Sequence, residues 1–370
     1  MVRESHHLTQ YLPKVLLLGV HAPYNRTSSI DSYFQEFRSL VQTNGVIAQH
    51  EFYLKLRAID PTFFLSKGKL HEIKKIIDEH AIDHLIISES LTVQQEACLR
   101  DFLRCKIFDR THLILDIFEK HAHSAEGKAQ VAIAMLQHKK ARLAGRGIHL
   151  SQQAGRIGSR GPGETAKEKE TRHIENAILR LQRELEKIER ARITQRKQRL
   201  ANKVPHVSLI GYTNAGKSSI LNALTKSQVI AENKPFSTLD TTTRELYIAG
   251  KKIGLISDTV GFIQQLPPHL INAFKSTLSE LQFADLLLHV IDISNHNWRS
   301  HVDVVLRILC DLGIDKPMLY IFNKSDIIEP TTELTDITMH YMPSVVTDTV
   351  SKQGVNALRD YLTTWYQQRS

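Results

Sequence analysis

The chain has 370 residues, 42% of them hydrophobic, and is therefore long enough for two or three domains that each bury a core. Lysine and arginine (48) outnumber aspartate and glutamate (39), and such a surplus favours an anionic partner. No apolar run approaches the roughly 18 to 20 residues of a membrane-spanning helix, which excludes an integral membrane segment.

The N-terminus and the cysteines indicate a compartment. The N-terminus is polar and predicts no secretion signal. The three cysteines, Cys98, Cys105 and Cys310, have neither the spacing of metal ligands nor the even number of a disulfide set. We therefore expect a cytoplasmic protein.

Residues 1–112 alternate between strand-like and helix-like patterns. The strand patterns cover 15–20, 84–88 and 105–108, and the helix patterns cover about 29–42, 70–80 and 92–104. Because short strands separated by helices imply a parallel sheet, we expect a small N-terminal α/β domain. No catalytic constellation is evident within it.

Residues 113–200 are predicted to form a helical coiled-coil hairpin. The pattern is helical to about Arg142 and again after Glu164. In the second helix, apolar residues recur at alternating steps of three and four, at Ile174, Ile178, Leu181, Leu185 and Ile188. This spacing is that of a coiled-coil seam, and we expect the preceding helix to be its partner.

The segment from Gly145 to Glu164 contains six glycines and one proline, so we expect no regular structure there. Arg146, Arg156 and Arg160 alternate with these glycines, and no acidic residue occurs from position 139 to 163. Guanidinium groups on adaptable backbone suit RNA phosphates, so these arginines are candidate RNA-binding residues. The alternative is a disordered linker.

A second basic cluster lies near the end of the hairpin. Its members are Arg190, Arg192, Arg196, Lys197 and Arg199. Such residues suit either RNA contact or the C-terminus of a helix, where cations are favoured.

Residues 201–370 begin with a phosphate-binding signature. It reads Gly211-Tyr212-Thr213-Asn214-Ala215-Gly216-Lys217-Ser218 and matches GxxxxGK[ST] between a strand pattern and a helix pattern. Such a loop wraps phosphates with backbone N–H groups at a helix N-terminus. We expect Lys217 to reach the β and γ phosphates and the Ser218 hydroxyl to bind Mg²⁺.

Two later motifs indicate a guanine nucleotide. Asn323-Lys324-Ser325-Asp326 follows a strand pattern, and the Asp326 carboxylate can accept hydrogen bonds from N1–H and N2–H₂ of guanine, a donor pair that adenine lacks. Asp258-Thr259-Val260-Gly261 follows another strand pattern, where Asp258 would hold Mg²⁺ through a water and the Gly261 N–H would meet the γ-phosphate. The order of the motifs predicts a P-loop GTPase domain that binds GTP and GDP.

Two further segments belong to the expected nucleotide site. Phe236-Ser237-Thr238-Leu239-Asp240 is predicted to respond to the nucleotide, with Thr238 as an Mg²⁺ ligand among four competing threonines. Counting back from Gly354 places Asp348-Thr349 where related GTPases carry a Ser-Ala pair over the base. We expect this exchange to weaken guanine affinity.

The residue after Gly261 is Phe262, where many small GTPases carry a glutamine that orients the attacking water. The catalytic group therefore stays unassigned, and unassisted hydrolysis should be slow. Phe262 could instead pack under the nucleotide-sensitive segment while backbone or a partner places the water. Both interpretations require an activator.

The chain closely resembles the HflX family of translation-associated GTPases. The resemblance rests on Gly161-Pro162-Gly163-Glu164 ahead of a charged helix, followed by the motifs at 211–218, 236–240 and 258–263. The N-terminal pattern of the family is matched as well, by Lys67-Gly68-Lys69, Phe108-Asp109-Arg110-Thr111, Leu115-Asp116-Ile117-Phe118 and Glu126-Gly127-Lys128. Ala166-Lys167-Glu168-Lys169 departs from the usual sequence after the glycine-rich loop.

The resemblance implies a factor that binds the large ribosomal subunit and its rRNA near the factor-binding and peptidyl-transferase regions. It implies that the GTP-bound protein helps to split or rescue stalled ribosomes under stress, with hydrolysis stimulated by the ribosome. By the same resemblance Ser218 and Thr238 would bind Mg²⁺, and the loop from Gly145 to Glu164 would reach rRNA.

Two other hypotheses stay open. A nucleotide-regulated RNA-binding or RNA-remodelling protein would use ATP through the N-terminal domain, although no second phosphate loop precedes Gly211. A scaffold would dimerise through the coiled-coil seam. We expect a monomer, because the two helices of a hairpin can pair with each other.

Overall fold

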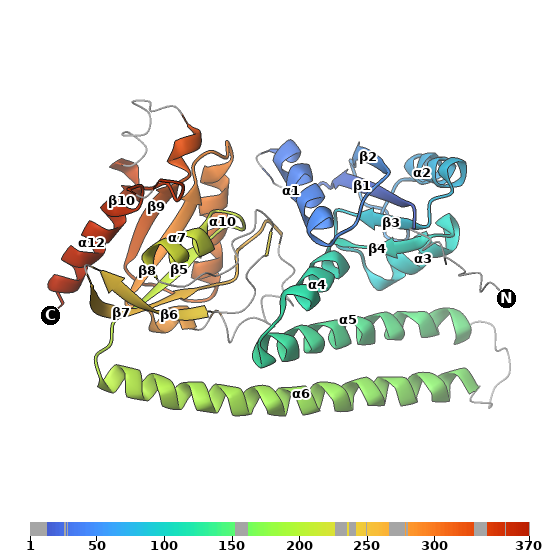
Figure 1. Ribbon diagram of the computed structural model, residues 1–370. Helices are drawn as coiled ribbons and strands as arrows, with labels where there is room; N and C mark the ends of the chain where they lie inside the picture. The colour runs from blue at the N-terminus through green and yellow to red at the C-terminus, as the bar shows by residue number, and fades with distance from the viewer. Residues whose placement is uncertain are drawn as a thin grey trace, which may run out of the picture. The chain divides into compact units, whose positions relative to one another are not determined.

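The computed structural model describes residues 13–25, 27, 29–151, 162–225, 235–236, 242–248, 250–265, 278, 280–328, 339–351 and 353–369. Contacts divide the chain into two compact units, Met1–Ile114 and Leu115–Ser370 (Figure 1). Among the helices of these described ranges, none is long and apolar enough to cross a membrane.

The first unit is built on a four-stranded parallel sheet in the order β2-β1-β3-β4. Its strands are β1 (Val15–His21), β2 (His50–Lys55), β3 (His84–Ile87) and β4 (Lys106–Phe108). The crossovers that parallel strands require are α1 (Ile30–Thr43), α2 (Lys67–His80) and α3 (Val93–Leu103). The predicted small α/β domain with a parallel sheet is confirmed.

A local signal explains where α3 begins. At the start of α3, the Thr92 hydroxyl accepts a hydrogen bond from the Gln95 N–H at 3.2 Å, and the Gln95 side chain accepts one from the Thr92 N–H at 3.0 Å. This capping box satisfies backbone donors that the first helical turn leaves unpaired.

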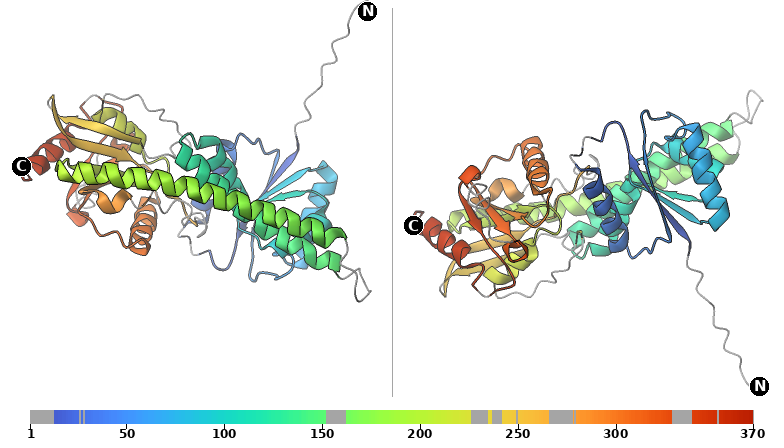
Figure 2. Two further views of the ribbon diagram at one scale, coloured as in Figure 1. Left: turned by 90° about the horizontal axis from the view of Figure 1, so that it is seen from below. Right: turned by 90° about the horizontal axis from the view of Figure 1, so that it is seen from above.

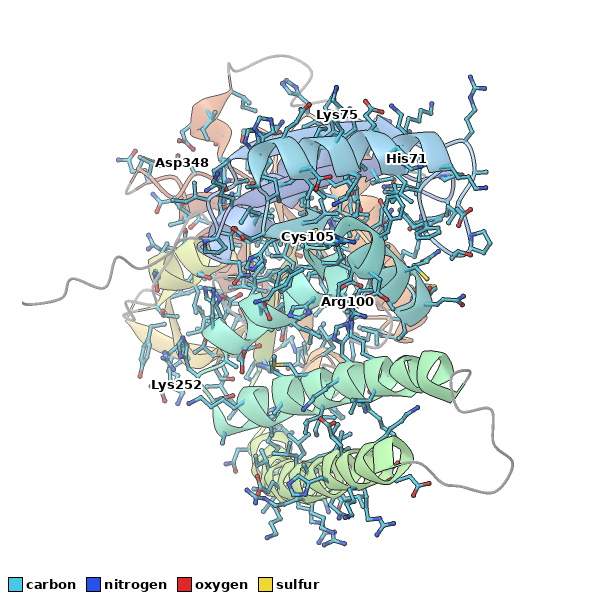
Figure 3. All side chains as sticks on the ribbon, turned by 90° about the vertical axis from the view of Figure 1, so that its right-hand side faces the viewer. His71, Lys75, Arg100, Cys105, Lys252 and Asp348 are labelled. Atoms are coloured by element: carbon cyan, nitrogen blue, oxygen red, sulfur yellow. The ribbon has the colours of Figure 1, made fainter. Side chains whose placement is uncertain are left out.

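Cys105, labelled in Figure 3, packs in the core cluster with Ile73 and Leu99, and burial raises the pKa of its thiol to about 11.

Arg110 is a buried cation of the first unit and begins α4 (Arg110–His121). Its guanidinium pairs with Glu36 at 2.5 Å and lies 5.0 Å from the ring centre of Tyr33. Because an unpaired buried charge is costly, this arrangement fixes α1 against the start of α4. The motif around Arg110 therefore has a structural role.

The second unit contains two long antiparallel helices, α5 (Ala125–Ser151) and α6 (Pro162–Ala201), which lie side by side (Figures 1 and 2). Most of the described α6 side chains that are not exposed follow one stripe: Lys167, Thr171, Ile174, Ile178, Leu181, Leu185, Ile188 and Arg192. Their alternating steps of three and four are those of a coiled coil. The predicted hairpin is confirmed, with α5 as the partner.

The glycine-rich segment is more regular than expected. The prediction of no regular structure from Gly145 to Glu164 is wrong at both ends, because α5 continues to Ser151 and α6 begins at Pro162. A glycine inside a helix costs only about 1 kcal/mol relative to alanine, which a long helix tolerates, and proline suits the first helical position. Arg146 lies within α5, whereas Arg156 and Arg160 lie outside the described residues.

The remainder of the second unit is a six-stranded sheet in the order β10-β9-β8-β5-β7-β6, in which only β6 and β7 pair antiparallel. Its strands are β5 (His206–Gly211), β6 (Thr242–Ile248), β7 (Lys251–Asp258), β8 (Leu286–Asp292), β9 (Met318–Asn323) and β10 (Ser344–Val346). Its described helices of more than four residues are α7 (Lys217–Leu224), α10 (Trp298–Asp311) and α12 (Asn356–Gln367).

This topology decides where the motifs meet. The parallel strands β5, β7 and β9 run in the same direction, and each leads at its carboxyl end into one of the predicted nucleotide motifs. In open α/β sheets, ligands bind at that edge. The predicted P-loop GTPase fold is confirmed.

Candidate functional site

The phosphate loop, residues 211–218, connects β5 to the first turn of α7. Gly216 has a φ of +95°, and a Cβ at this position would overlap the amide nitrogen of the Asn323 side chain. Only glycine therefore allows the loop to turn here beside the third motif. The loop ends at the N-terminus of α7, where backbone N–H groups can point at an anion.

The amine of Lys217 lies inside this loop. Its Nζ donates hydrogen bonds to the carbonyl oxygens of Tyr212 at 2.8 Å and Gly211 at 3.2 Å. Burial lowers the pKa of Lys217 to about 8, against the opposing effect of the Asp258 carboxylate. An anionic phosphate beside the amine would favour its charged form.

Ser218 and Asp258 come together from α7 and β7. The Ser218 Oγ donates to the Asp258 Oδ2 at 2.7 Å, and both side chains are buried. A hydroxyl and a carboxylate are oxygen donors of the kind that Mg²⁺ prefers. The two residues thus fit the predicted metal role, in which Asp258 acts through water. Thr238, the other predicted ligand, lies outside the described residues.

The main chain after Asp258 is bound to the phosphate loop. Phe262 donates its N–H to the Gly211 carbonyl at 3.2 Å and accepts from the Thr213 N–H at 2.8 Å. A Cβ on Gly261 would lie 3.0 Å from the Lys217 Nζ, so glycine allows this close approach. The Phe262 side chain is 2% exposed, which favours the interpretation that it packs under the segment.

Asn323 connects the third motif to two other loops. Its side-chain amide donates to the Ala215 carbonyl at 2.9 Å, and its carbonyl oxygen accepts from the Thr347 hydroxyl at 3.2 Å. Lys324, at φ +62°, pairs through Nζ with the Asp292 Oδ2 at 2.6 Å. Asp326 is exposed, so its carboxylate is accessible to a ligand.

Thr347 and Asp292 contact the third motif, although no sequence motif includes them. Thr347 follows β10, and Asp292 lies opposite Asn323 in the register of β8 and β9. The only sequence signal was their place at the ends of strand patterns, next to a motif.

Asp348 closes the loop predicted to lie over the base. Its carboxylate accepts hydrogen bonds from the Ser351 N–H at 2.6 Å and the Ser351 hydroxyl at 2.9 Å (Asp348 is labelled in Figure 3). The backbone bond from Ser351 holds the pKa of Asp348 below its usual value. The Asp348 N–H also donates to the Gly354 carbonyl at 3.2 Å. The carboxylate therefore supports the loop itself, and Thr349 follows within it.

Phe236 is the one described residue of the predicted nucleotide-sensitive segment. Its ring is buried and meets the ring of Phe118 in α4 edge to face, with ring centres 4.7 Å apart. Its φ of +60° is unusual for a bulky side chain. Ser237, Leu239 and Asp240 lie outside the described residues together with Thr238.

Three family models match consecutive parts of the chain. Residues 31–119 match "GTP-binding GTPase N-terminal", residues 121–199 match "GTP-binding GTPase Middle Region", and residues 206–324 match "50S ribosome-binding GTPase". The last of these contains the phosphate loop, Asp258-Thr259-Val260-Gly261 and the first two residues of the third motif, Asn323 and Lys324.

Whole-chain relatives agree with these matches. GTPase HflX of Caldanaerobacter subterraneus subsp. tengcongensis is 44% identical over 295 residues, covering 80% of this chain and 69% of that protein. GTPase HflX of Flavobacterium psychrophilum is 38% identical over 353 residues, covering 95% and 83%. A GTP-binding protein from the archaeon Sulfolobus solfataricus, solved in complex with GDP, has a TM-score of 0.51 at 25% identity and covers 96% of this chain and 100% of that chain. On these identities and coverages, the chain belongs to the HflX family of GTPases.

Proposed function

We propose that this GTPase acts on translation in the cytoplasm, where it binds the large ribosomal subunit and splits or rescues stalled ribosomes under stress. The observation that carries the proposal is the match of residues 206–324, which hold the phosphate loop and Asp258-Thr259-Val260-Gly261, to a family described as a 50S ribosome-binding GTPase. The net charge of +9 supports a partner rich in phosphate.

Each part of the nucleotide has an assigned group in this proposal. The phosphate loop and Lys217 hold the phosphates, and the Gly261 N–H meets the γ-phosphate. Asn323 and Asp326 select guanine, while Asp348 and Thr349 shape the loop over the base. Mg²⁺ would be held by Ser218 and Thr238, with Asp258 acting through water, and would neutralise phosphate charge.

The position of Phe262 supports the need for an activator. Its ring is buried and carries no hydrogen-bonding group, so the side chain offers nothing that could orient a water, and its main chain is bound to the phosphate loop. Hydrolysis by the protein alone should therefore be slow. We propose that the ribosome supplies or orders the missing group.

We propose that the chain has three parts, residues 1–112, 113–200 and 201–370. The proposed contact with rRNA lies in the second part, the hairpin. Lys139 and Lys140 of α5 pair with acidic residues of α6, at 3.0 Å to Glu170 and 2.7 Å to Glu175. These two lysines thus have protein partners. We assign the rRNA contact to Arg146, Arg156 and Arg160. Because α5 and α6 pair within one chain, we propose a monomer.

The test is GTP hydrolysis with and without purified large ribosomal subunits, using Lys217→Ala as the blank. We expect stimulation of at least about tenfold, since a partner that completes a GTPase site commonly gives more than this. Subunit binding without stimulation would overturn the ribosome as the activator. If the protein does not bind the large subunit with GTP or with a non-hydrolysable GTP analogue, the ribosome is not its partner.

A further inference from the structure

Tyr212 makes contacts that the phosphate loop itself does not require. A phosphate loop uses backbone N–H groups, and its second residue needs no particular side chain. Here the Tyr212 side chain is 6% exposed, and its hydroxyl accepts a hydrogen bond from the Gln264 N–H at 2.7 Å. Its ring stacks on His301 of α10, with ring centres 3.8 Å apart and planes within 5° of parallel.

The Gln264 bond is one of three that hold the same stretch of main chain. The other two join Phe262 to Gly211 and Thr213, at 3.2 and 2.8 Å. Gly261 lies at the start of this stretch, in close approach to Lys217. The three bonds therefore help to position the Gly261 N–H relative to the phosphate loop.

Of these three bonds, only the one to Tyr212 depends on a side chain. Gly211 accepts its bond with the backbone carbonyl, and Thr213 donates its bond with the backbone N–H. Every residue except proline has both groups. Tyrosine is long enough to reach the Gln264 N–H across the loop, and its phenolic oxygen can accept the bond. His301 stacks on the face of the ring, and α10 packs on β5 and β8 in the same sheet (Figure 1).

We propose that Tyr212 is a positioning residue for GTP hydrolysis. Its hydroxyl holds the segment from Gly261 to Gln264 against the phosphate loop, so that the Gly261 N–H is directed at the γ-phosphate. The stack on His301 fixes the hydroxyl and links this segment to α10. The inference rests on the proposed function, which assigns residues 211–218 and 258–261 to the phosphates.

The first variant is Tyr212→Phe, which keeps the stacked ring and removes the hydroxyl. Because GDP has no γ-phosphate, its Kd should stay within about twofold of the unmodified protein. The Kd of a non-hydrolysable GTP analogue should rise, and kcat should fall, by about two- to tenfold, as expected for one neutral hydrogen bond. Tyr320→Phe in β9 is the matched control and should change none of these constants.

Two variants of His301 test the stack separately. His301→Ala removes the ring support and should shift the analogue Kd and kcat in the same direction as Tyr212→Phe. His301→Phe keeps an aromatic ring and should restore both constants, a rescue that distinguishes support of the tyrosine from chemistry of the imidazole. These variants also keep the inference testable if Tyr212→Phe does not fold.

Three results would overturn the inference. Equal weakening of GDP and analogue binding would mean that the hydroxyl shapes the phosphate loop as a whole. If the analogue Kd and kcat of Tyr212→Phe are unchanged, the Tyr212 hydroxyl has no role in hydrolysis. If hydrolysis becomes faster, the bond from Gln264 to Tyr212 belongs to a conformation that slows the reaction. Failure of the unmodified protein to bind GDP would instead overturn the proposed function, so the two failures are distinguishable.

Discussion

At the level of single residues, Lys217 combines a binding role with a shifted pKa. Its amine is enclosed by protein and donates to two carbonyl oxygens of its own loop, so burial lowers its pKa to about 8 from 10.5. A bound phosphate favours the ammonium form. Nucleotide binding should therefore raise the pKa of Lys217. At a pH where the amine of the ligand-free protein is neutral, binding should be accompanied by uptake of a proton.

We predict that nucleotide affinity falls as the pH rises above about 8, by up to about tenfold per pH unit, because a proton must then be bound with the nucleotide. The Kd of GDP, measured from about pH 7 to pH 9, checks this prediction. Calorimetry in two buffers of different ionisation enthalpy should detect proton uptake near pH 9. A constant Kd across this range would contradict the shift.

The Lys217 amine also affects the stability of the ligand-free protein, and this effect has the opposite pH dependence to nucleotide affinity. Its pKa in the folded, ligand-free protein lies below that of the unfolded chain, so the unfolded chain binds more protons between about pH 8 and 10.5. The contribution of Lys217 to the free energy of unfolding therefore rises with pH across this range. Affinity and ligand-free stability should change in opposite directions there.

Residues whose role depends on a local motif could be predicted, whereas residues whose role depends on strand register could not. The loop from Gly211 to Ser218 is defined by its own spacing, because its chemistry uses backbone and two side chains. The pairing of Lys324 with Asp292 depends on Asp292 lying opposite Asn323 in neighbouring strands. No local pattern in the sequence contains that information.

At the level of elements, a partly buried ion pair joins α5 to α6 near the start of α5. Arg192 of α6 meets the Glu126 carboxylate of α5 with both terminal nitrogens, at 2.8 and 3.1 Å. The Glu126 side chain is 10% exposed and also accepts from Gln130 at 3.2 Å. Arg192, one member of the second basic cluster, therefore has a structural partner.

We predict that Glu126→Ala lowers the free energy of unfolding by about 1–3 kcal/mol, since it leaves a partly buried guanidinium without its carboxylate. Glu175→Ala, which removes an exposed pair with Lys140, is the control and should cost at most about 1 kcal/mol. Urea midpoints and hydrogen exchange at the start of α5 measure the two effects. Equal losses would contradict a special role for Glu126.

The elements also differ in how well the sequence predicts them. The pattern predicted a helix over about 92–104, and α3 spans Val93–Leu103. The edge strand β2 was missed, because only Leu54 in it is fully buried and the strand lacks a continuous apolar run. The glycines near the end of α5 were read as breakers, although their cost is small against a helix of 27 residues.

For the whole molecule, the proposed function places the nucleotide site and the rRNA contact in different parts of the chain. The nucleotide motifs belong to the six-stranded sheet, whereas the arginines assigned to rRNA belong to the hairpin sequence. Changes in the hairpin should therefore weaken the partner contact while GTP binding is retained. The salt dependence of the contact can then show whether it is made to phosphates.

We predict that Arg156→Ala with Arg160→Ala weakens binding to the large subunit and leaves the Kd of GDP unchanged. If each arginine neutralises one phosphate, the slope of log K against log salt should flatten by about 1.4 to 1.8, because two counterions fewer are released. Arg172→Ala with Arg183→Ala removes the same charge from exposed positions of α6 and is the matched control. Equal weakening in both double variants would assign the contact to net charge alone, and a parallel loss of GDP binding would indicate misfolding.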